Sequence, residues 1–400
     1  MKIMLMQIQQ KPENIVREIF KSRGSPRKRI SSIFSQMRLH WPLGPQGAAA
    51  KGLETYPAGI EIGSASVKVA QLARSGGSFE IVKCGYLSCA GAAPGAGAKS
   101  MRDCLEELVK QNKISGEVVT SLPINKIQAL TFVLPNMPEN EIESALVWKL
   151  RQNPPAGTTF EGICFDYLVV SGYQADMNKE LQILVFAASK EMVMEQVELF
   201  RGLSLELIAV EPKPYAALNA LFWLGSIHPE ETALVLQLGA AQSAITIMHT
   251  AAPKLMRPLA VCGNSFSEAI SNYHRMDFQQ AEQLKIREGL SKGASSACLA
   301  ALSSQLESLV VDIEHTFKYF SHQLMKSQIN SFDHVILCGG SALLKGLDKF
   351  LSERLEAPVE VFNPFSTFNL YARQELSQQV KDNAAGFSSV LGLAARNIEW

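Results

Sequence analysis

Two short glycine turns are the features of this sequence whose residue types could do chemistry. Residues 63–66 (Gly-Ser-Ala-Ser) and 239–242 (Gly-Ala-Ala-Gln) each lie between two runs of alternating apolar residues, the pattern of a β-hairpin. Backbone N–H groups in such a turn point towards one spot, where they bind phosphate oxygens without a charged side chain. A single turn of this kind is most often only a turn. Two of them, 176 residues apart (239 − 63), predict two similar lobes that face each other.

A third glycine element supports this interpretation. A predicted strand that ends near Leu337 is followed by Gly339-Gly340-Ser341 and a predicted helix. Together with the two turns, it predicts a nucleotide whose phosphates lie between the lobes and whose base lies against the Gly339–Gly340 backbone. The sequence has no GxxxxGK[ST] motif and no GxGxxG between a strand and a helix, so P-loop and Rossmann folds do not fit.

The elements that would position these turns form a mixed α/β chain. Apolar alternation predicts strands over 60–72 around the first turn, 79–87, 117–122, 127–134, 163–170, 181–187, 232–238, 243–249, 254–259, 334–337 and 359–361. Helical spacing predicts helices over 101–109, 139–151, 190–201, 265–274, 279–287, 299–322, 343–355 and 390–396.

Composition narrows the class of protein. A chain of 400 residues is long enough for two or more packed units, and 47% hydrophobic residues with 19% charged residues indicate a globular protein. Formal net charge is zero, which argues against general nucleic-acid binding. Seven scattered cysteines without CxxC spacing indicate reduced thiols and no metal site. Since neither a membrane-spanning apolar run nor a signal peptide is evident, we expect a cytoplasmic protein.

The sequence of residues 1–56 indicates a separate basic extension and linker. They contain ten Lys/Arg against three Asp/Glu, a net charge of +7, which leaves −7 for the remainder. Residues 14–23 and 29–39 can each form a short amphipathic helix, and 42–57 resemble a linker. Such a segment could bind an anionic membrane surface. The alternatives are a disordered basic tail or a start codon assigned too early.

Beyond residue 56 the chain resembles a known family. Residues 59–68 (GIEIGSASVK) resemble the first phosphate loop of the actin-like ATPases, in the form found in the type IV pilus assembly PilM family. Further similar segments follow in the family's order: 210–212, 236–240, 278–285, 338–347, 362–365 and 391–396. Leu134-Pro135 ahead of the helix with Trp148, Asn363-Pro364-Phe365 and the terminal Leu-Gly-Leu point to this family rather than to a filament former or a sugar kinase.

The resemblance implies an α/β, two-lobed actin-like fold, that is, a duplicated ribonuclease-H-like fold, with an inserted α+β subdomain. We expect the extension over 1–56, the first part of lobe 1 over 57–123, the inserted subdomain over 124–204, a return to lobe 1 over 205–230, lobe 2 over 231–380, and a C-terminal helix returning to lobe 1 over 381–400.

The resemblance also implies a site for ATP or ADP between the lobes. Its expected contacts are Gly63, Ser64 and Ser66 to the phosphates from one side, Gly239 and Ala240 from the other, Glu282 and Lys285 near the ribose, and Gly339, Gly340 and Ser341 near adenosine. From the residues alone, Glu282 and Lys285 would instead be a surface helix pair at i, i+3.

Two departures from the family bear on the chemistry. Gln237 stands where the family usually has an aspartate, and an amide can neither hold Mg²⁺ by charge nor accept a proton from water. Glu61 keeps a carboxylate on the first lobe and is the candidate metal-water ligand for Mg²⁺. The second departure is Cys262-Gly263-Asn264, where relatives have paired glycines. We therefore expect nucleotide binding with weak or absent hydrolysis.

The function that the resemblance implies is that of a cytoplasmic adaptor at the inner face of the inner membrane. Its partners would be the N-terminal tail of a PilN-like membrane protein and other platform and motor components of the pilus machinery, with membrane contact indirect or through residues 1–56. Two alternatives stay open. One is an FtsA-like filament protein, whose membrane helix is normally C-terminal. The other is a small-molecule kinase of the same fold, which needs metal-binding carboxylates that Gln237 does not supply.

Overall fold

A computed structural model describes residues 54–75, 78–89, 100–154, 157–171, 180–228, 230–325, 329–366, 370–372 and 375–396. The basic extension and its two predicted helices, up to residue 53, lie outside the described residues.

Two large sheets share one topology. The first contains β2 (Ala58–Ile62), β3 (Ser66–Ser75), β4 (Ser78–Ser88), β5 (Gly116–Leu122) and β9 (Leu205–Pro212) in the order β4-β3-β2-β5-β9. The second contains β10 (Thr232–Leu238), β11 (Ser243–His249), β12 (Ala252–Leu259), β13 (His334–Cys338) and β14 (Val359–Val361) in the order β12-β11-β10-β13-β14. In each sheet the first three strands along the chain pair antiparallel and the last two pair parallel. The duplication predicted from two turns therefore extends over five strands.

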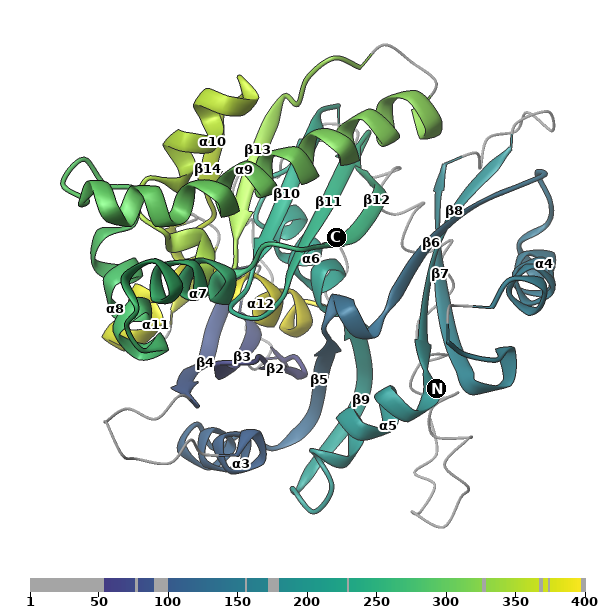
Figure 1. Ribbon diagram of the computed structural model, residues 1–400. Helices are drawn as coiled ribbons and strands as arrows, with labels where there is room; N and C mark the ends of the chain where they lie inside the picture. Colours follow the sequence, from purple (N-terminus) through teal and green to yellow (C-terminus); the bar gives the residue numbers. More distant parts are fainter. Residues whose placement is uncertain are drawn as a thin grey trace.

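A third, smaller sheet interrupts the first lobe between β5 and β9. It has the order β6-β8-β7, with β6 (Gln128–Leu134), β7 (Ile163–Ser171) and β8 (Leu181–Ser189) all antiparallel. Helix α4 (Glu139–Gln152) packs on it through Ile142, Leu146 and Leu150, which are fully buried at successive helical turns. In Figure 1 this unit lies beside the second sheet, with α4 on its outer side.

Two helices lie between the large sheets (Figure 1): α6 (Lys213–Trp223) and α12 (Ser388–Ala394). Their side chains share one hydrophobic cluster with residues of β3 and β10, such as Leu218, Val390, Leu72 and Val235. Neither β9 nor α6 was among the elements predicted from the sequence. Because α6 is apolar on nearly all sides, its sequence has no polar face to reveal the helical period.

The remaining helices cover the outer faces: α3 (Met101–Gln111), α5 (Lys190–Glu198), α7 (Gly263–His274), α8 (Phe278–Glu288), α9 (Ser296–Tyr319), α10 (Leu347–Leu355) and α11 (Gln378–Asp382). Short helical turns are η1 (Ile124–Lys126), η2 (Phe160–Gly162), η3 (Phe320–Met325), η4 (Gly340–Leu343), η5 (Pro364–Ser366) and η6 (Ala384–Phe387). Among the described residues, one helix, Ser296–Met325, passes a length and hydropathy test for a membrane span. Its buried side chains belong to the core of the second sheet, so in this fold it is a covering helix.

Two sequence expectations need correction. The helix predicted over 343–355 begins only at Leu347, because Gly346 takes a left-handed φ of 80° after the short turn η4. Strand β15 (Leu370–Ala372) pairs with β4, and the two-residue β1 (Glu54–Thr55) pairs with β3. The chain therefore rejoins the first sheet before residue 380, where the sequence analysis ended lobe 2.

The contact between α12 and α6 depends on the absence of a side chain at Gly392. A Cβ atom built there would lie 1.7 Å from the carbonyl oxygen of Ala216. We expect Gly392→Ala to force these helices apart and to lower the free energy of unfolding by about 3 kcal/mol or more. Urea unfolding measures this loss. Gly293→Ala is the matched control, since a Cβ there meets nothing within 4 Å, and an equal effect of the two substitutions would contradict the packing argument.

Candidate functional site

The three glycine elements meet at the seam between the two lobes. The backbone N–H of Ala241 in the second turn donates to the hydroxyl Oγ of Ser64 in the first turn, at 3.3 Å. The hydroxyl of Ser341 in the third element donates to the carbonyl oxygen of Gly239, at 3.0 Å. Residues far apart in the sequence are thus in direct hydrogen-bond contact.

The two turns also close in the same way. The N–H of Gly63 donates to the carbonyl of Ser66 at 2.9 Å, and the N–H of Gly239 donates to the carbonyl of Gln242 at 3.0 Å. Gly339, at the root of the third element, has φ 91°, and a Cβ atom there would lie 2.3 Å from the carbonyl oxygen of Leu238. Glycine is therefore required where β13 passes the end of β10.

The tips of these turns are exposed. Ser64, Ala241 and Gly340 all face solvent. The Ser64 hydroxyl is an uncharged oxygen that accepts from the backbone N–H of the opposite turn, which is the same kind of contact that a phosphate oxygen makes in a backbone nest. The arrangement can therefore bind an anion once Ser64 turns aside.

Glu282 and Lys285 support the second turn from behind. The Lys285 ammonium group contacts Glu282 Oε2 at 2.6 Å, the Ser267 hydroxyl at 2.9 Å and the carbonyl of Gly263 at 3.0 Å. In turn the N–H of Gly263 donates to the carbonyl of Gly239, at 2.8 Å. Lys285 is buried, so the interpretation as a surface helix pair is wrong, and the pair connects α8 to the second turn through α7.

The segment that departs from the family, Cys262-Gly263-Asn264, is part of this support. The N–H of Asn264 donates to the carbonyl of Ala240 at 2.7 Å. The Cys262 N–H donates to Ser265 Oγ at 3.2 Å, which caps the start of α7. The backbone here therefore approaches the second turn closely with a single glycine.

Glu61, the predicted metal-water ligand, contacts two lysine side chains. Its Oε1 atom lies 3.0 Å from the Lys68 ammonium and 2.9 Å from the Lys213 ammonium, and the residue is 2% exposed. Burial alone would raise the pKa of Glu61, but the charges of Lys213 and Lys68 and their hydrogen bonds lower it to about 2. The three formal charges sum to +1 (two ammonium groups and one carboxylate). With both lysines protonated, the group has no net negative charge to offer to Mg²⁺, which prefers carboxylates.

Lys68 and Lys213 were not among the site residues predicted from the sequence. Glu61 and Lys68 are register partners across the β2–β3 hairpin, so the length of the predicted hairpin would have placed them side by side. No sequence signal connects Lys213, which comes from the start of α6, to Glu61. Gly386 lies beside both Lys68 and the third element, because a Cβ atom built on it would lie 3.8 Å from Lys68 Nζ and 3.7 Å from the backbone nitrogen of Gly340.

Gln237 is held by the C-terminal helix. Its Nε2 donates to the hydroxyl of Ser389 in α12 at 2.6 Å, and the residue is buried. Its register partner on β13, Cys338, lies close enough to the charged cluster for Lys213 and Glu61 to affect its pKa, which burial raises to about 12. The amide thus stands near the cluster and adds no charge to it.

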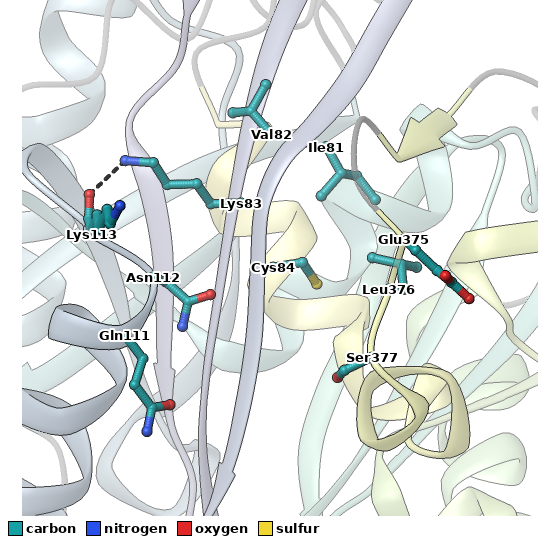
Figure 2. Close-up of a pocket in the computed structure, with 10 residues that line it drawn as sticks. All are labelled: Ile81, Val82, Lys83, Cys84, Gln111, Asn112, Lys113, Glu375, Leu376 and Ser377. Atoms are coloured by element: carbon teal, nitrogen blue, oxygen red, sulfur yellow. Dashed lines mark hydrogen bonds between the residues drawn. The ribbon is translucent and has the colours of Figure 1, made fainter.

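The described part of the chain also contains a pocket away from the seam. No group of three His, Cys, Asp or Glu side chains among the described residues could hold a metal ion. A pocket of about 440 Å³ lies between β4, the end of α3 and the segment before α11 (Figure 2). Lys83 points across it to donate to the carbonyl of Lys113 at 2.7 Å. Its lining includes none of the residues of the three glycine elements.

The Glu61 cluster predicts a pH dependence of stability. Because the pKa of Glu61 is lowered from 4.5 to about 2 on folding, its contribution of about 3 kcal/mol is complete above about pH 5 and is lost as pH falls towards 2. We expect the free energy of unfolding of Glu61→Gln to lie below that of the unsubstituted chain at about pH 7, and the gap to shrink at about pH 3. The exposed Glu117→Gln is the control. A gap that stays constant with pH would contradict the ion-paired state of Glu61.

Known proteins confirm both the fold and the family resemblance. Residues 59–398 match the family described as type IV pilus assembly protein PilM. A solved "PilM-PilN type IV pilus biogenesis complex" superposes with a TM-score of 0.71 at 23% sequence identity, covering 86% of this chain and 99% of that one. MreB 5 of Spiroplasma citri bound to AMPPNP gives a TM-score of 0.47 at 14% identity, covering 85% of this chain and 94% of the other.

The structural likeness confirms the predicted fold class, an α/β, two-lobed actin-like fold with an inserted α+β subdomain. The sequence match covers most of the chain. The chain belongs to the type IV pilus assembly protein PilM family.

Proposed function

We propose that this chain is the nucleotide-binding component of the type IV pilus assembly platform, placed in the cytoplasm against the inner membrane, and that it docks the N-terminal tail of a PilN-like membrane protein. The observation that carries the nucleotide part is the direct hydrogen bond between the first and second turns, from Ala241 N–H to Ser64 Oγ. The partner is suggested by the PilN named in the related complex. Other platform and motor components would complete the assembly.

The site would bind the phosphates of ATP or ADP between the two lobes. Gly63, Ser64 and Ser66 would contact them from the first lobe, and Gly239 and Ala240 from the second. Gly339, Gly340 and Ser341 would lie against the adenosine part, where Gly340 is exposed and a Cβ atom on it would meet nothing within 4 Å. These assignments are supported by the convergence of the three elements on one seam.

Weak or absent hydrolysis follows from the two side chains that could assist attack by water. Gln237 is an amide and cannot accept a proton at neutral pH. Glu61 is ionised, but its Oε1 already accepts from two ammonium groups, and its pKa of about 2 makes it a poor base. Binding without turnover suits an adaptor better than a kinase.

The tail would dock between the first lobe and the inserted subdomain, residues 124–204. Strand β9 ends the first sheet and β6 ends the small sheet, so each offers an edge to which an extended peptide can add. Large apolar side chains near the small sheet are exposed, namely Val133 on β6 and Trp148 on α4. They could supply pockets for alternate side chains of the peptide.

Strand β12 connects the proposed nucleotide site to the subdomain that would dock the tail. At its start, the Lys254 ammonium donates to the carbonyl of Val170 in the inserted subdomain at 2.9 Å, and burial lowers the pKa of Lys254 to about 8. After its end, the chain reaches Gly263, whose N–H donates to Gly239 in the second turn. A shift of the second turn on nucleotide binding would therefore move β12 and change its contact with the inserted subdomain.

The docking proposal is tested with a peptide that matches the cytoplasmic N-terminal tail of the PilN-like protein. We expect the peptide to bind the full chain with an affinity that differs by about fivefold or more between the nucleotide-free and ATP-bound states. Lys254→Met should reduce that difference, because it removes the contact of β12 with Val170, whereas the exposed Lys292→Met should not. Absence of peptide binding with and without nucleotide would contradict the docking proposal.

The hydrolysis proposal is tested by phosphate release. The unsubstituted protein should release phosphate slowly or not at all, and Gln237→Asp should raise the rate by about tenfold or more because it restores a carboxylate near the cluster. Gln237→Asn, which has the same size as the aspartate without its charge, is the control. Rapid Mg²⁺-dependent release by the unsubstituted protein that Glu61→Ala abolishes would overturn this proposal.

A further inference from the structure

The contact group around Glu61 has a formal charge of +1 when both of its lysines are protonated. Burial lowers the pKa of Lys68, the Glu61 carboxylate opposes that shift, and the Lys213 charge adds to it, so an incoming anion would favour the protonated form of Lys68. Lys68, Lys213 and Glu61 form one contact group with two ammonium ions and one carboxylate, and Gln237 beside them is neutral. A divalent cation in this place would stand next to two like charges. An anion would instead meet a charge of the opposite sign.

The three side chains of the cluster differ in their exposure to solvent. The side chain of Lys213 is 22% exposed, that of Lys68 is 9% exposed and that of Glu61 is 2% exposed. Lys68 and the backbone nitrogen of Gly340 both lie within 4 Å of the place that a Cβ atom on Gly386 would take. The carboxylate is therefore the most buried member of the group, and Lys213 is the most exposed.

Glu61 acts as an anchor for the lysines. Both ammonium groups share its Oε1, while its buried Oε2 has no hydrogen-bond partner among the described residues. An unpaired buried carboxylate oxygen is costly, so Oε2 is left to accept from a water molecule or from a ligand hydroxyl. The geometry holds two long, flexible side chains in one place before any ligand arrives, which removes part of the entropic cost of binding.

We propose that Lys68 and Lys213 take the place of the divalent cation in this chain, so that it binds the metal-free form of a nucleoside di- or triphosphate. This rests on the proposed nucleotide function and specifies the ionic form of its ligand. The backbone N–H groups of the turns would hold the outer phosphate oxygens, and the ammonium pair would neutralise the charge that Mg²⁺ neutralises elsewhere.

Isothermal titration of the nucleotide-free, full-length protein with ATP and with ADP tests the proposal, once in EDTA and once in excess Mg²⁺. The affinity should be as high in EDTA as in Mg²⁺, or higher, because Mg²⁺ converts free ATP to its complex. An affinity about tenfold or more higher in Mg²⁺ would overturn the proposal while leaving nucleotide binding intact. Absence of binding in both media would overturn the nucleotide function and this inference with it.

Variants of the exposed member of the cluster sharpen the result. Lys213→Met should lower the affinity for ATP in EDTA by about tenfold, and Mg²⁺ should then restore part of it because the cluster loses its excess charge. Lys213→Arg should keep metal-free binding, and Lys292→Met should leave it unchanged. Urea unfolding checks that each variant is folded. Equal binding by Lys213→Met and the unsubstituted chain in EDTA would exclude Lys213 from the site.

Discussion

Helix α12 can lie between the two large sheets only because two glycines leave room for it. Gly59 lies in the strand that α12 contacts, and Gly392 lies in α12 itself where it contacts α6. A Cβ atom on Gly59 of β2 would lie 2.3 Å from the carbonyl oxygen of Val390, and one on Gly392 would collide with α6. Through this contact a C-terminal segment becomes part of the first lobe's core while its neighbour Gly386 lies against Lys68. The buried ion pair between Arg396 and Glu211, at 2.7 Å, fixes the end of the same segment to β9.

The same packing places the polar groups of the seam. Lys213 begins α6 and Ser389 lies in α12, so the helix pair delivers one ammonium group to Glu61 and one hydroxyl to Gln237. The first lobe contributes Glu61 and Lys68 from its hairpin, and the second contributes Gln237 from β10. A buried charge is tolerated here because each member of the cluster has an opposite charge within hydrogen-bond distance. The site is thus a product of the interface between lobes more than of either lobe.

Much of this fold could be predicted from sequence because its signals are local. Glycine turns flanked by alternating apolar residues identified the two hairpins, and helical spacing identified most outer helices. Helix α6 gave no such signal because it is buried on nearly all sides, and β15 is three residues long and pairs with a strand almost three hundred positions earlier. At the site, the hairpin register contained the Glu61–Lys68 pair, whereas the contact with Lys213 exists only after α6 has packed on the first sheet. Sequence reasoning about Glu61 could therefore not take the second ammonium group into account.

The position of the small sheet has a consequence for how such proteins diversify. Strands β5 and β9 are parallel neighbours, so the chain must in any case cross from the end of one to the start of the other. In the second lobe the equivalent crossing, from β13 to β14, is made by the single helix α10, and in the first lobe α5 precedes β9 in the same way. The whole unit β6–β8 is therefore spliced into an obligatory connection, ahead of its helix, without interrupting a ladder of the sheet. This unit can therefore change in length or sequence while the strand pairing of both large sheets stays the same.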